Sequence, residues 1–144
     1  QWDGQRGWRN QAILWHECRM TERTDFLSQA GELLGNRGFT TDPDLLAPWV
    51  SDWRGRFHGK ALGMASPADT HQVAAFVQLC AQHGVPIVPQ GGNSGMSGGA
   101  TPDASGAAVL LSLRRMDRIR ALDPVARQVT CDAGVVLQRL HEAA

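Results

Sequence analysis

The chain has 144 residues, 42% hydrophobic and 19% charged, which is typical of one globular domain rather than of a disordered segment. Its 14 basic and 14 acidic side chains balance, so no basic field exists to hold nucleic acid or an anionic membrane. No apolar run reaches the roughly 20 residues of a membrane helix, so we expect no transmembrane segment. The cysteines (Cys18, Cys80 and Cys131) are too few and too widely spaced for a disulfide framework, which favours a cytoplasmic location.

The first nineteen residues differ from the rest of the chain. They hold three of the five tryptophans, show no steady period and lack an initial methionine. We therefore expect residues 1–19 to be an extension outside the domain, with Met20 as the natural start. A native arm that packs its tryptophans on the core is the alternative.

Two short helices are predicted next. The first covers residues 26–35 and ends at Gly35. The second covers residues 41–53, where Pro43 suits a first helical turn and Pro48 shortens or kinks the helix. These helices form an N-terminal lead-in.

A strand, a helix and a second strand are predicted after this lead-in. Residues 61–66 form the first strand, and Ser66 is expected to cap the following helix with Pro67 at its first position. Residues 85–89 form the second, buried strand, and this order predicts a parallel pair joined by a right-handed crossover. The apolar stripe of the helix recurs at helical spacing: Val73, Phe76, Val77 and Cys80.

The last third of the chain is predicted to be mostly strands. A continuous apolar strand covers residues 106–113, and strands 119–123 and 128–134 are joined by a reversal at Asp123-Pro124. A final helix over 135–144 has no terminating glycine or proline, which is typical of a fragment of a longer protein. The predicted fold class is α+β, with a small parallel or mixed sheet flanked by helices.

The segment 89–102, PQGGNSGMSGGATP, carries the clearest functional signal. Five of its nine residues from 91 to 99 are glycine, which loses more conformational freedom on folding than any other residue. Such a loop presents successive amide donors to one anion, each worth about 1.5 to 3 kcal/mol when the acceptor is charged. Ordering ten residues at binding costs on the order of 10 to 20 kcal/mol, so the flanking strands have to preform the loop.

Two common phosphate-binding motifs do not fit this loop. The nucleotide P-loop ends in Gly-Lys-Ser/Thr, which the segment lacks. The dinucleotide fingerprint Gly-x-Gly-x-x-Gly is also missing, because the glycines run Gly92-x-x-Gly95-x-x-Gly98. We therefore expect another phosphate-containing ligand.

The stretch VPIVPQGGNSGMSGGATP resembles the FAD pyrophosphate loop of the p-cresol methylhydroxylase and vanillyl-alcohol oxidase superfamily. It is most similar to the branch of D-lactate dehydrogenases, D-2-hydroxyglutarate dehydrogenases and glycolate oxidase FAD subunits, whose pattern is P-x-G-G-N-T-G-hydrophobic-x-G-G. Ser94 replaces the usual threonine and keeps its hydroxyl. The resemblance covers about residues 38–144, since further stretches follow in the family's order: SDWRGRFHGKA, SPADTHQVAAFVQLCAQHGVPIVPQGG, LLSLRRMDRIRALDP and VTCDAGVVLQRL.

This resemblance implies that residues 57–144 are the first part of a FAD-binding domain of the p-cresol methylhydroxylase type, truncated at its C-terminus, after a lead-in over 20–56. Gly99 would let the chain fold back, and Ala133 and Gly134 would approach the cofactor from the neighbouring strand end. A histidine in this loop links the flavin covalently in some superfamily members; its absence here implies non-covalent FAD. The backbone expected to hold the pyrophosphate is that of Gly91, Gly92, Asn93, Ser94, Gly95 and Met96.

Most other polar residues are expected to be structural. The DWRGRF stretch and His58 are interpreted as a polar turn with Trp53 and Phe57 packed inward; a position facing the substrate is the alternative. The histidines lack the spacing of a metal site, and Cys80 is interpreted as a core residue. An arginine cluster is assigned to a solvent-facing turn, with phosphate contact as the alternative: Arg114, Arg115, Arg118 and Arg120.

The resemblance implies a flavin-dependent oxidoreductase that oxidises a 2-hydroxy acid such as D-lactate, glycolate or D-2-hydroxyglutarate and passes electrons to an unknown acceptor. The family supplies its catalytic residues from a later cap domain, so we name none here and expect these residues to be inactive alone. Two alternatives stay open. One is a different alcohol, aldehyde or sugar substrate on the same flavin scaffold, and the other is a non-redox nucleotide-binding module.

Overall fold

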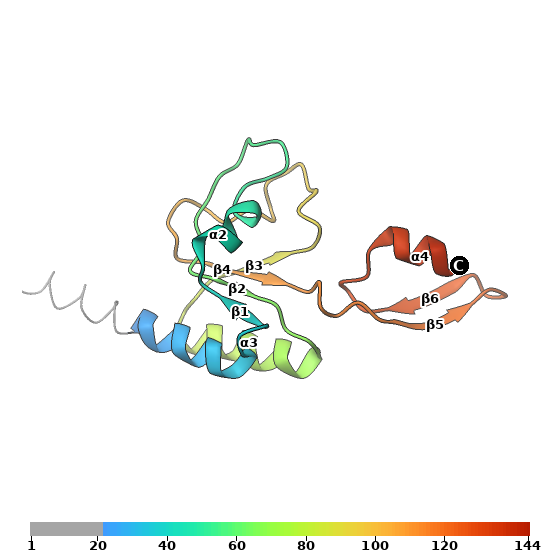
Figure 1. The fold of residues 1–144 in the computed structure, drawn as a ribbon, viewed down its shortest axis with the longest axis horizontal. Helices are drawn as coiled ribbons and strands as arrows, with labels where there is room; N and C mark the ends of the chain where they lie inside the picture. The colour runs from blue at the N-terminus through green and yellow to red at the C-terminus, as the bar shows by residue number, and fades with distance from the viewer. Residues whose placement is uncertain (1–21) are drawn as a thin grey trace, which may run out of the picture.

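The computed structural model of the protein describes residues 22–144, so the tryptophan-rich segment and Met20 lie outside the described residues. None of the helices described in this range has the length and hydropathy to cross a membrane. In chain order the elements are a helix over residues 22–34, β1 (Phe39–Thr40), α2 (Pro43–Leu46), a 3-10 helix η1 (Ala47–Trp49), β2 (Met64–Ala65), α3 (Thr70–Gln82), β3 (Ile87–Gln90), β4 (Val109–Ser112), β5 (Ile119–Asp123), β6 (Gln128–Cys131) and α4 (Leu137–Ala143) (Figure 1).

Four strands form a mixed sheet in the order β1-β2-β4-β3. Both β2 and β3 run parallel to β4, while β1 runs antiparallel to β2. This confirms the α+β class with a small mixed sheet. The strands on either side of α3 are parallel, as predicted, but they do not pair with each other, because β4 lies between them. Its four residues are all buried, and such a strand belongs at the centre of a sheet.

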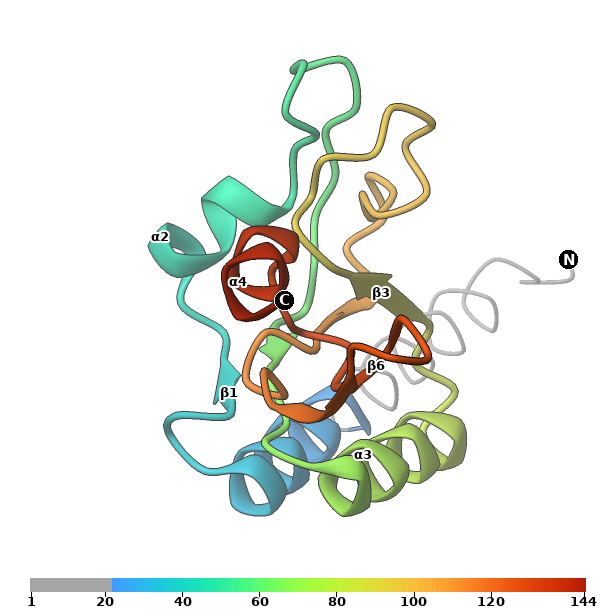
Figure 2. The same cartoon turned by 90° about the vertical axis from the view of Figure 1, so that its right-hand side faces the viewer.

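The core lies on both faces of this sheet. The helix over 22–34 and α3 lie side by side against one face, and α2 lies on the other (Figures 1 and 2). Phe26 and Phe76 are fully buried between the two helices, with ring centroids 6.2 Å apart. On the opposite face Leu46 packs with Met64 and Leu110. The predicted lead-in over residues 20–56 thus shares its core with the sheet wherever the structure describes it. The domain boundary at residue 57 stays a prediction.

The N-terminus of α3 differs from the prediction. Asp69, not Ser66, caps this helix, and its carboxylate accepts a hydrogen bond of 2.9 Å from the amide of Gln72. Ser66 is buried instead, with its amide donating to the Gly38 carbonyl at 2.6 Å and its own carbonyl accepting from Arg115 at 2.7 Å. Helix α3 therefore begins only at Thr70, four residues after Ser66.

The apolar stripe of α3 is largely confirmed. Phe76 and Cys80 are buried, whereas Val77 is 41% exposed and Leu79 takes its place in the core. Burial raises the pKa of the Cys80 thiol to about 11, which confirms its assignment to the core.

Several helices and strands differ in length from the prediction. The first helix ends before Gly35, whose φ of 67° confirms it as the stop, but it is already formed at residue 22. The helix predicted over 41–53 consists of α2 and η1 only. Strand β1, two residues long, was not predicted.

The predicted reversal after Asp123 is confirmed as an antiparallel pair, β5 and β6. Two amides in the turn, those of Val125 and Ala126, donate to the Asp123 carboxylate at 3.0 and 2.9 Å. The two strands form a sheet of their own, and Figure 1 shows them with α4 projecting from the C-terminal end of β4, away from the four-stranded sheet.

Candidate functional site

The glycine-rich loop leaves the C-terminal end of β3. Because β3 and β4 are parallel, Gln90 at the end of β3 is the register partner of Ser112 at the end of β4. The loop therefore starts at the edge where parallel strands of α/β proteins usually present their ligand-binding loops. It rises beside the loop over residues 51–58 on the same side of the molecule (Figure 1).

Gln90 holds both ends of the glycine loop. Its side chain is buried, and its Nε2 donates one hydrogen bond to the Trp49 carbonyl and one to the Ala100 carbonyl, each 2.8 Å long. The loop is thus closed at its base and tied to η1. Sequence analysis missed this residue, although a polar side chain at the end of the apolar stretch IVPQ was a usable signal.

Asn93 anchors the middle of the loop. Its backbone has a φ of 54°, a left-handed conformation that asparagine adopts more readily than most residues. Its side-chain amide donates to the Ser51 carbonyl at 2.7 Å and lies 3.4 Å from the Pro48 carbonyl. The side chain of Asn93 therefore fixes the loop to the segment that follows α2.

The loop reverses one residue earlier than predicted. The left-handed backbone is at Gly98, with a φ of 75°, and the Thr101 amide donates to the Gly98 carbonyl at 3.0 Å. A Cβ atom at Gly98 would also lie 3.1 Å from the ring of Phe57. Gly99 has neither constraint, so the fold-back assigned to it belongs to Gly98.

The main-chain amides of residues 91–97 have no backbone acceptor in the part of the chain that the structure describes, residues 22–144. A Cβ atom at Gly91, Gly92 or Gly95 would meet no protein atom within 4 Å, and none of the three has a positive φ. Neither packing nor backbone strain inside the chain explains these glycines. They leave an uncovered backbone that can approach a ligand closely.

A cavity of about 380 Å³ lies next to the loop. It is lined by ten residues: Trp49, Gly91, Gly92, Leu113, Arg114, Ala133, Gly134, Val135, Val136 and Leu137. The structure thus brings together four of the nine residues that sequence analysis assigned to the cofactor, from two segments about forty residues apart. The other five do not line this cavity. Ser94, Gly95 and Met96 are exposed on the loop, with Met96 63% exposed.

The second wall of the cavity is fixed by backbone packing. The Gly134 amide donates to the Met116 carbonyl at 2.9 Å, and a Cβ atom at Gly134 would collide with the Leu113 carbonyl. Glycine is therefore required at this position by the chain itself. The same contact holds Ala133 and Gly134 beside the end of β4.

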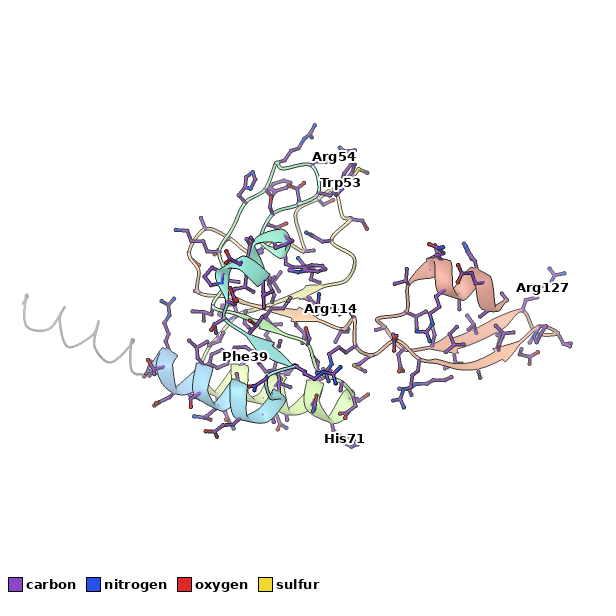
Figure 3. The ribbon with its side chains drawn as sticks, in the orientation of Figure 1. Phe39, Trp53, Arg54, His71, Arg114 and Arg127 are labelled. Carbon is purple, nitrogen blue, oxygen red and sulfur yellow. The ribbon has the colours of Figure 1, made fainter. Side chains whose placement is uncertain are left out.

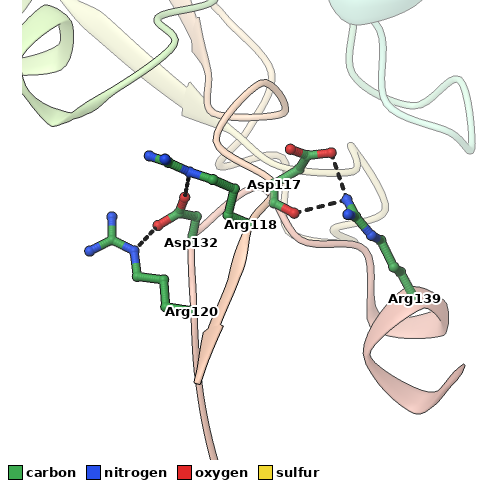
Figure 4. Close-up of polar contacts among 5 residues, drawn as sticks. All are labelled: Asp117, Arg118, Arg120, Asp132 and Arg139. Atoms are coloured by element: carbon green, nitrogen blue, oxygen red, sulfur yellow. Dashed lines mark hydrogen bonds and ion pairs between the residues drawn. The ribbon is translucent and has the colours of Figure 1, made fainter. Parts of the chain in front are cut away.

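A buried carboxylate precedes this wall. Asp132 is 5% exposed and pairs with Nε of Arg120 at 2.5 Å and with Nε of Arg118 at 3.4 Å (Figure 4). Burial opposes its ionisation, but the hydrogen bonds and charges of Arg120 and Arg118 outweigh that effect and hold the pKa of Asp132 below its ordinary value. Asp132 thereby ties β6 to β5 just before the chain enters the cavity wall.

The arginine cluster does not form a purely solvent-facing turn. Arg118 and Arg120 pair with Asp132, and Arg115 donates to the carbonyl of buried Ser66. Arg114 lies over the ring of Trp49, with its guanidinium carbon 5.1 Å from the ring centroid, and it lines the cavity. Each of the four side chains therefore has a defined partner.

The 51–58 loop is a polar turn, as predicted, but its inside is not aromatic. Trp53 is 60% exposed and Phe57 is 45% exposed, so the prediction that they pack inward is wrong. Asp52 occupies the inside, where its Oδ1 accepts from the amides of Arg56 and Phe57 at 2.7 and 2.8 Å. The Phe57 amide, above all, holds the pKa of Asp52 below its ordinary value. His58 contacts Ser51 within the same turn.

The sequence places the chain in a known family. A family model described as "FAD binding domain" matches residues 61–144, more than half of the chain. The chain belongs to this FAD-binding family. It is 34% identical over 117 residues to the "Probable D-2-hydroxyglutarate dehydrogenase, mitochondrial" of Oryza sativa subsp. indica, an alignment that covers 81% of this chain and 21% of that protein.

Two further comparisons agree with this family. The chain is 32% identical over 112 residues to the "Putative D-lactate dehydrogenase C713.03, mitochondrial" of Schizosaccharomyces pombe, covering 78% of this chain and 21% of that protein. Its fold is similar to that of p-cresol methylhydroxylase, with a TM-score of 0.75 at 24% identity over 85% of this chain and 24% of the other. The chain spans about a fifth of the length of the relatives it matches.

The residues around the cavity fit the diphosphate of FAD. In the described part of the chain the amides of residues 91–97 have no backbone acceptor, no protein atom lies within 4 Å of a Cβ built at Gly91 or Gly92, and one cation lines the wall. Within residues 22–144 there is no cluster of three or more histidine, cysteine or acidic side chains that could hold a metal ion. The expected FAD-binding domain is confirmed by the family match, and its fold is similar to that of p-cresol methylhydroxylase.

Proposed function

We propose that this chain forms the diphosphate-binding part of the FAD site of an oxidoreductase that oxidises a 2-hydroxy acid. The observation that carries the proposal is the shared cavity, where the free loop at Gly91 and Gly92 faces the segment of Ala133 and Gly134. The proposed cofactor-binding residues are the nine assigned from sequence, with Gly99 included as part of the loop beside its turn at Gly98: Gly91, Gly92, Asn93, Ser94, Gly95, Met96, Gly99, Ala133 and Gly134. At Asn93 the contact would come from the backbone, because its side chain is held by Ser51.

FAD is proposed to bind without a covalent bond. The cavity-lining residues include no histidine, cysteine or tyrosine, the usual side chains for attachment to flavin. In the loop, asparagine and serine stand where some members of the superfamily have a linking histidine. The bound flavin would accept the hydride, while these residues hold the cofactor and keep its position.

The substrate class rests on relatives and not on the cavity. The two relatives above are named as dehydrogenases of D-2-hydroxyglutarate and D-lactate, both 2-hydroxy acids. The groups that bind the acid and remove its hydroxyl proton are proposed to lie outside the 144 residues. An alcohol or sugar as substrate is the rival proposal. No residue of the described range 22–144 is proposed to bind the electron acceptor.

A cytoplasmic location is also proposed. It rests on free cysteines, with Cys80 buried and Cys131 exposed, which suit a reducing compartment. Both relatives above carry a mitochondrial designation, so the mitochondrion is the rival location. Imaging of the tagged full-length protein separates the two. Because the basic and acidic side chains of the chain balance, we propose no nucleic acid as a partner.

The test uses the full-length gene product. Purified protein is expected to show a flavin spectrum, and acid precipitation should release the flavin into the supernatant because the bond is not covalent. D-lactate, glycolate and D-2-hydroxyglutarate are then added one at a time without oxygen, and bleaching of the flavin identifies the substrate. A protein that takes up no FAD would contradict the proposal. Bleaching by alcohols or sugars alone would favour the rival substrate class.

A further inference from the structure

Arg114 is the one charged side chain among the ten residues that line the cavity. The rest of the wall consists of tryptophan, glycine, alanine and aliphatic residues. Two glycines of the wall belong to the loop whose amides are free. A positive charge is therefore placed beside main-chain donors on a surface that is otherwise uncharged.

The guanidinium of Arg114 is held by a contact with the ring of Trp49. The guanidinium carbon lies 5.1 Å from the centroid of the Trp49 ring, within the range of a cation–π interaction. The Trp49 carbonyl is held by Gln90, and its ring packs on the apolar cluster around Leu46. Arg114 lies two residues after the end of β4, near the point where the chain leaves the sheet (Figure 3).

Arg114 also has no anionic partner in the described part of the chain. Arg118 and Arg120 pair with Asp132, and Arg139 pairs with Asp117 at 2.7 Å (Figure 4). No carboxylate pairs with Arg114 in residues 22–144. Its charge is consequently available to a bound anion, in contrast to the neighbouring arginines.

We infer that Arg114 binds an anionic oxygen of the FAD diphosphate, as a side-chain complement to the main-chain donors of the loop. This inference rests on the proposed function. The planar guanidinium offers paired N–H donors that match phosphate oxygens, and its contact with the Trp49 ring holds it beside the cavity that both residues line. The carboxylate of a 2-hydroxy acid is the competing anion. The diphosphate is favoured because Arg114 lines the same cavity as Gly91 and Gly92.

The experiment measures the dissociation constants of three ligands with the full-length apoprotein. FAD contains both flavin and diphosphate, ADP contains the diphosphate without flavin, and riboflavin contains the flavin without phosphate. Arg114→Met is expected to weaken binding of FAD and ADP by about tenfold or more and to leave riboflavin unchanged. Arg114→Lys keeps the charge and should retain most of the affinity. Added salt should weaken FAD binding less in Arg114→Met than in the wild type.

A matched control is provided by Arg54. It lies 4.8 Å over the ring of Trp53, the same kind of contact, but on the outer loop and away from the cavity (Figure 3). Arg54→Met should bind all three ligands as the wild type does.

Three results would overturn the inference. If Arg114→Met loses as much affinity for riboflavin as for FAD, the substitution has a general effect on the fold. If Arg114→Lys binds FAD as weakly as Arg114→Met does, the charge is not the cause. Unchanged FAD affinity in Arg114→Met, combined with a raised KM for the hydroxy acid, would assign Arg114 to the substrate. A wild-type protein that binds neither FAD nor ADP would overturn the proposed function as well, so the two failures are distinguishable.

Discussion

Gln90 donates a hydrogen bond of 2.8 Å to the carbonyl of Ala100, ten residues further along the chain, and so closes the base of the glycine loop. A second bond of the same length joins Gln90 to Trp49. The loop can therefore be ordered before any ligand arrives, which removes most of the entropic cost of binding.

Replacing Gln90 with methionine should weaken both the fold and the cofactor site. Two carbonyls lose their donor, and each lost hydrogen bond in a buried position costs about 1 to 3 kcal/mol. We expect the free energy of unfolding to fall and the FAD dissociation constant to rise, measured by urea denaturation and by flavin fluorescence titration. Gln82→Met, an exposed position at the end of α3, should change neither quantity. An unaltered FAD affinity in Gln90→Met would show that the two hydrogen bonds of Gln90 do not order the loop for the cofactor.

Two glycines of the cavity should respond differently to substitution. A Cβ atom at Gly92 would meet no protein atom of the described chain within 4 Å, so Gly92→Val is expected to change stability by less than about 0.5 kcal/mol. It should nevertheless abolish flavin retention, because the new side chain shields amides that are worth about 1.5 to 3 kcal/mol each to a charged oxygen. Retention of flavin by Gly92→Val would count strongly against the loop assignment.

Gly134→Ala tests the opposite wall. Its Cβ would collide with the Leu113 carbonyl, so the backbone has to shift. We expect a loss of stability of about 1 to 3 kcal/mol even without cofactor. Thermal unfolding of the apoproteins of both glycine variants checks this contrast. Equal melting temperatures for the two would show that the packing at Gly134 is not tight.

Asp132 should make stability depend on acid pH. Its pKa in the folded protein is lowered from 3.8, so the unfolded chain takes up a proton at a higher pH than the folded one. The stabilisation is therefore fully present well above pH 3.8, begins to fall as the pH approaches that value, and disappears as the pH drops through the lowered pKa. Asp132→Asn should lose stability at pH 7 and show a flatter decline in acid, measured by denaturation between about pH 2 and 7. A difference between the two proteins that does not shrink in acid would rule out this ion pair as its source.

The two described cysteines should differ in reactivity. Cys80 is 1% exposed and burial raises its pKa to about 11, whereas Cys131 is exposed on β6. Iodoacetamide at pH 7.5 should label the Cys131 peptide in the native protein and reach Cys80 only after unfolding, because the thiolate is the reactive form. Peptide mass mapping provides the readout. Early labelling of Cys80 would show that the core around α3 opens readily.

Much of this fold was predictable because it is encoded locally. The spacing of Phe76 and Cys80 indicates α3, Gly35 ends the first helix, and the density of glycines between 91 and 99 indicates a loop. Each of these signals depends on neighbours a few residues apart, whose backbone preferences act without the rest of the molecule.

Other features depend on contacts between distant segments. The central place of β4, the anchoring of Asn93 on Ser51 and the pairing of Asp132 with Arg120 each join residues that no local pattern connects. Sequence by itself determined that residues 91–99 form a glycine-rich loop, since glycine content sets how much of the backbone side chains leave uncovered. Only the tertiary structure decided that Gly92 and Gly134 meet at one cavity beside Arg114, because strand order and buried hydrogen bonds bring segments about forty residues apart into contact.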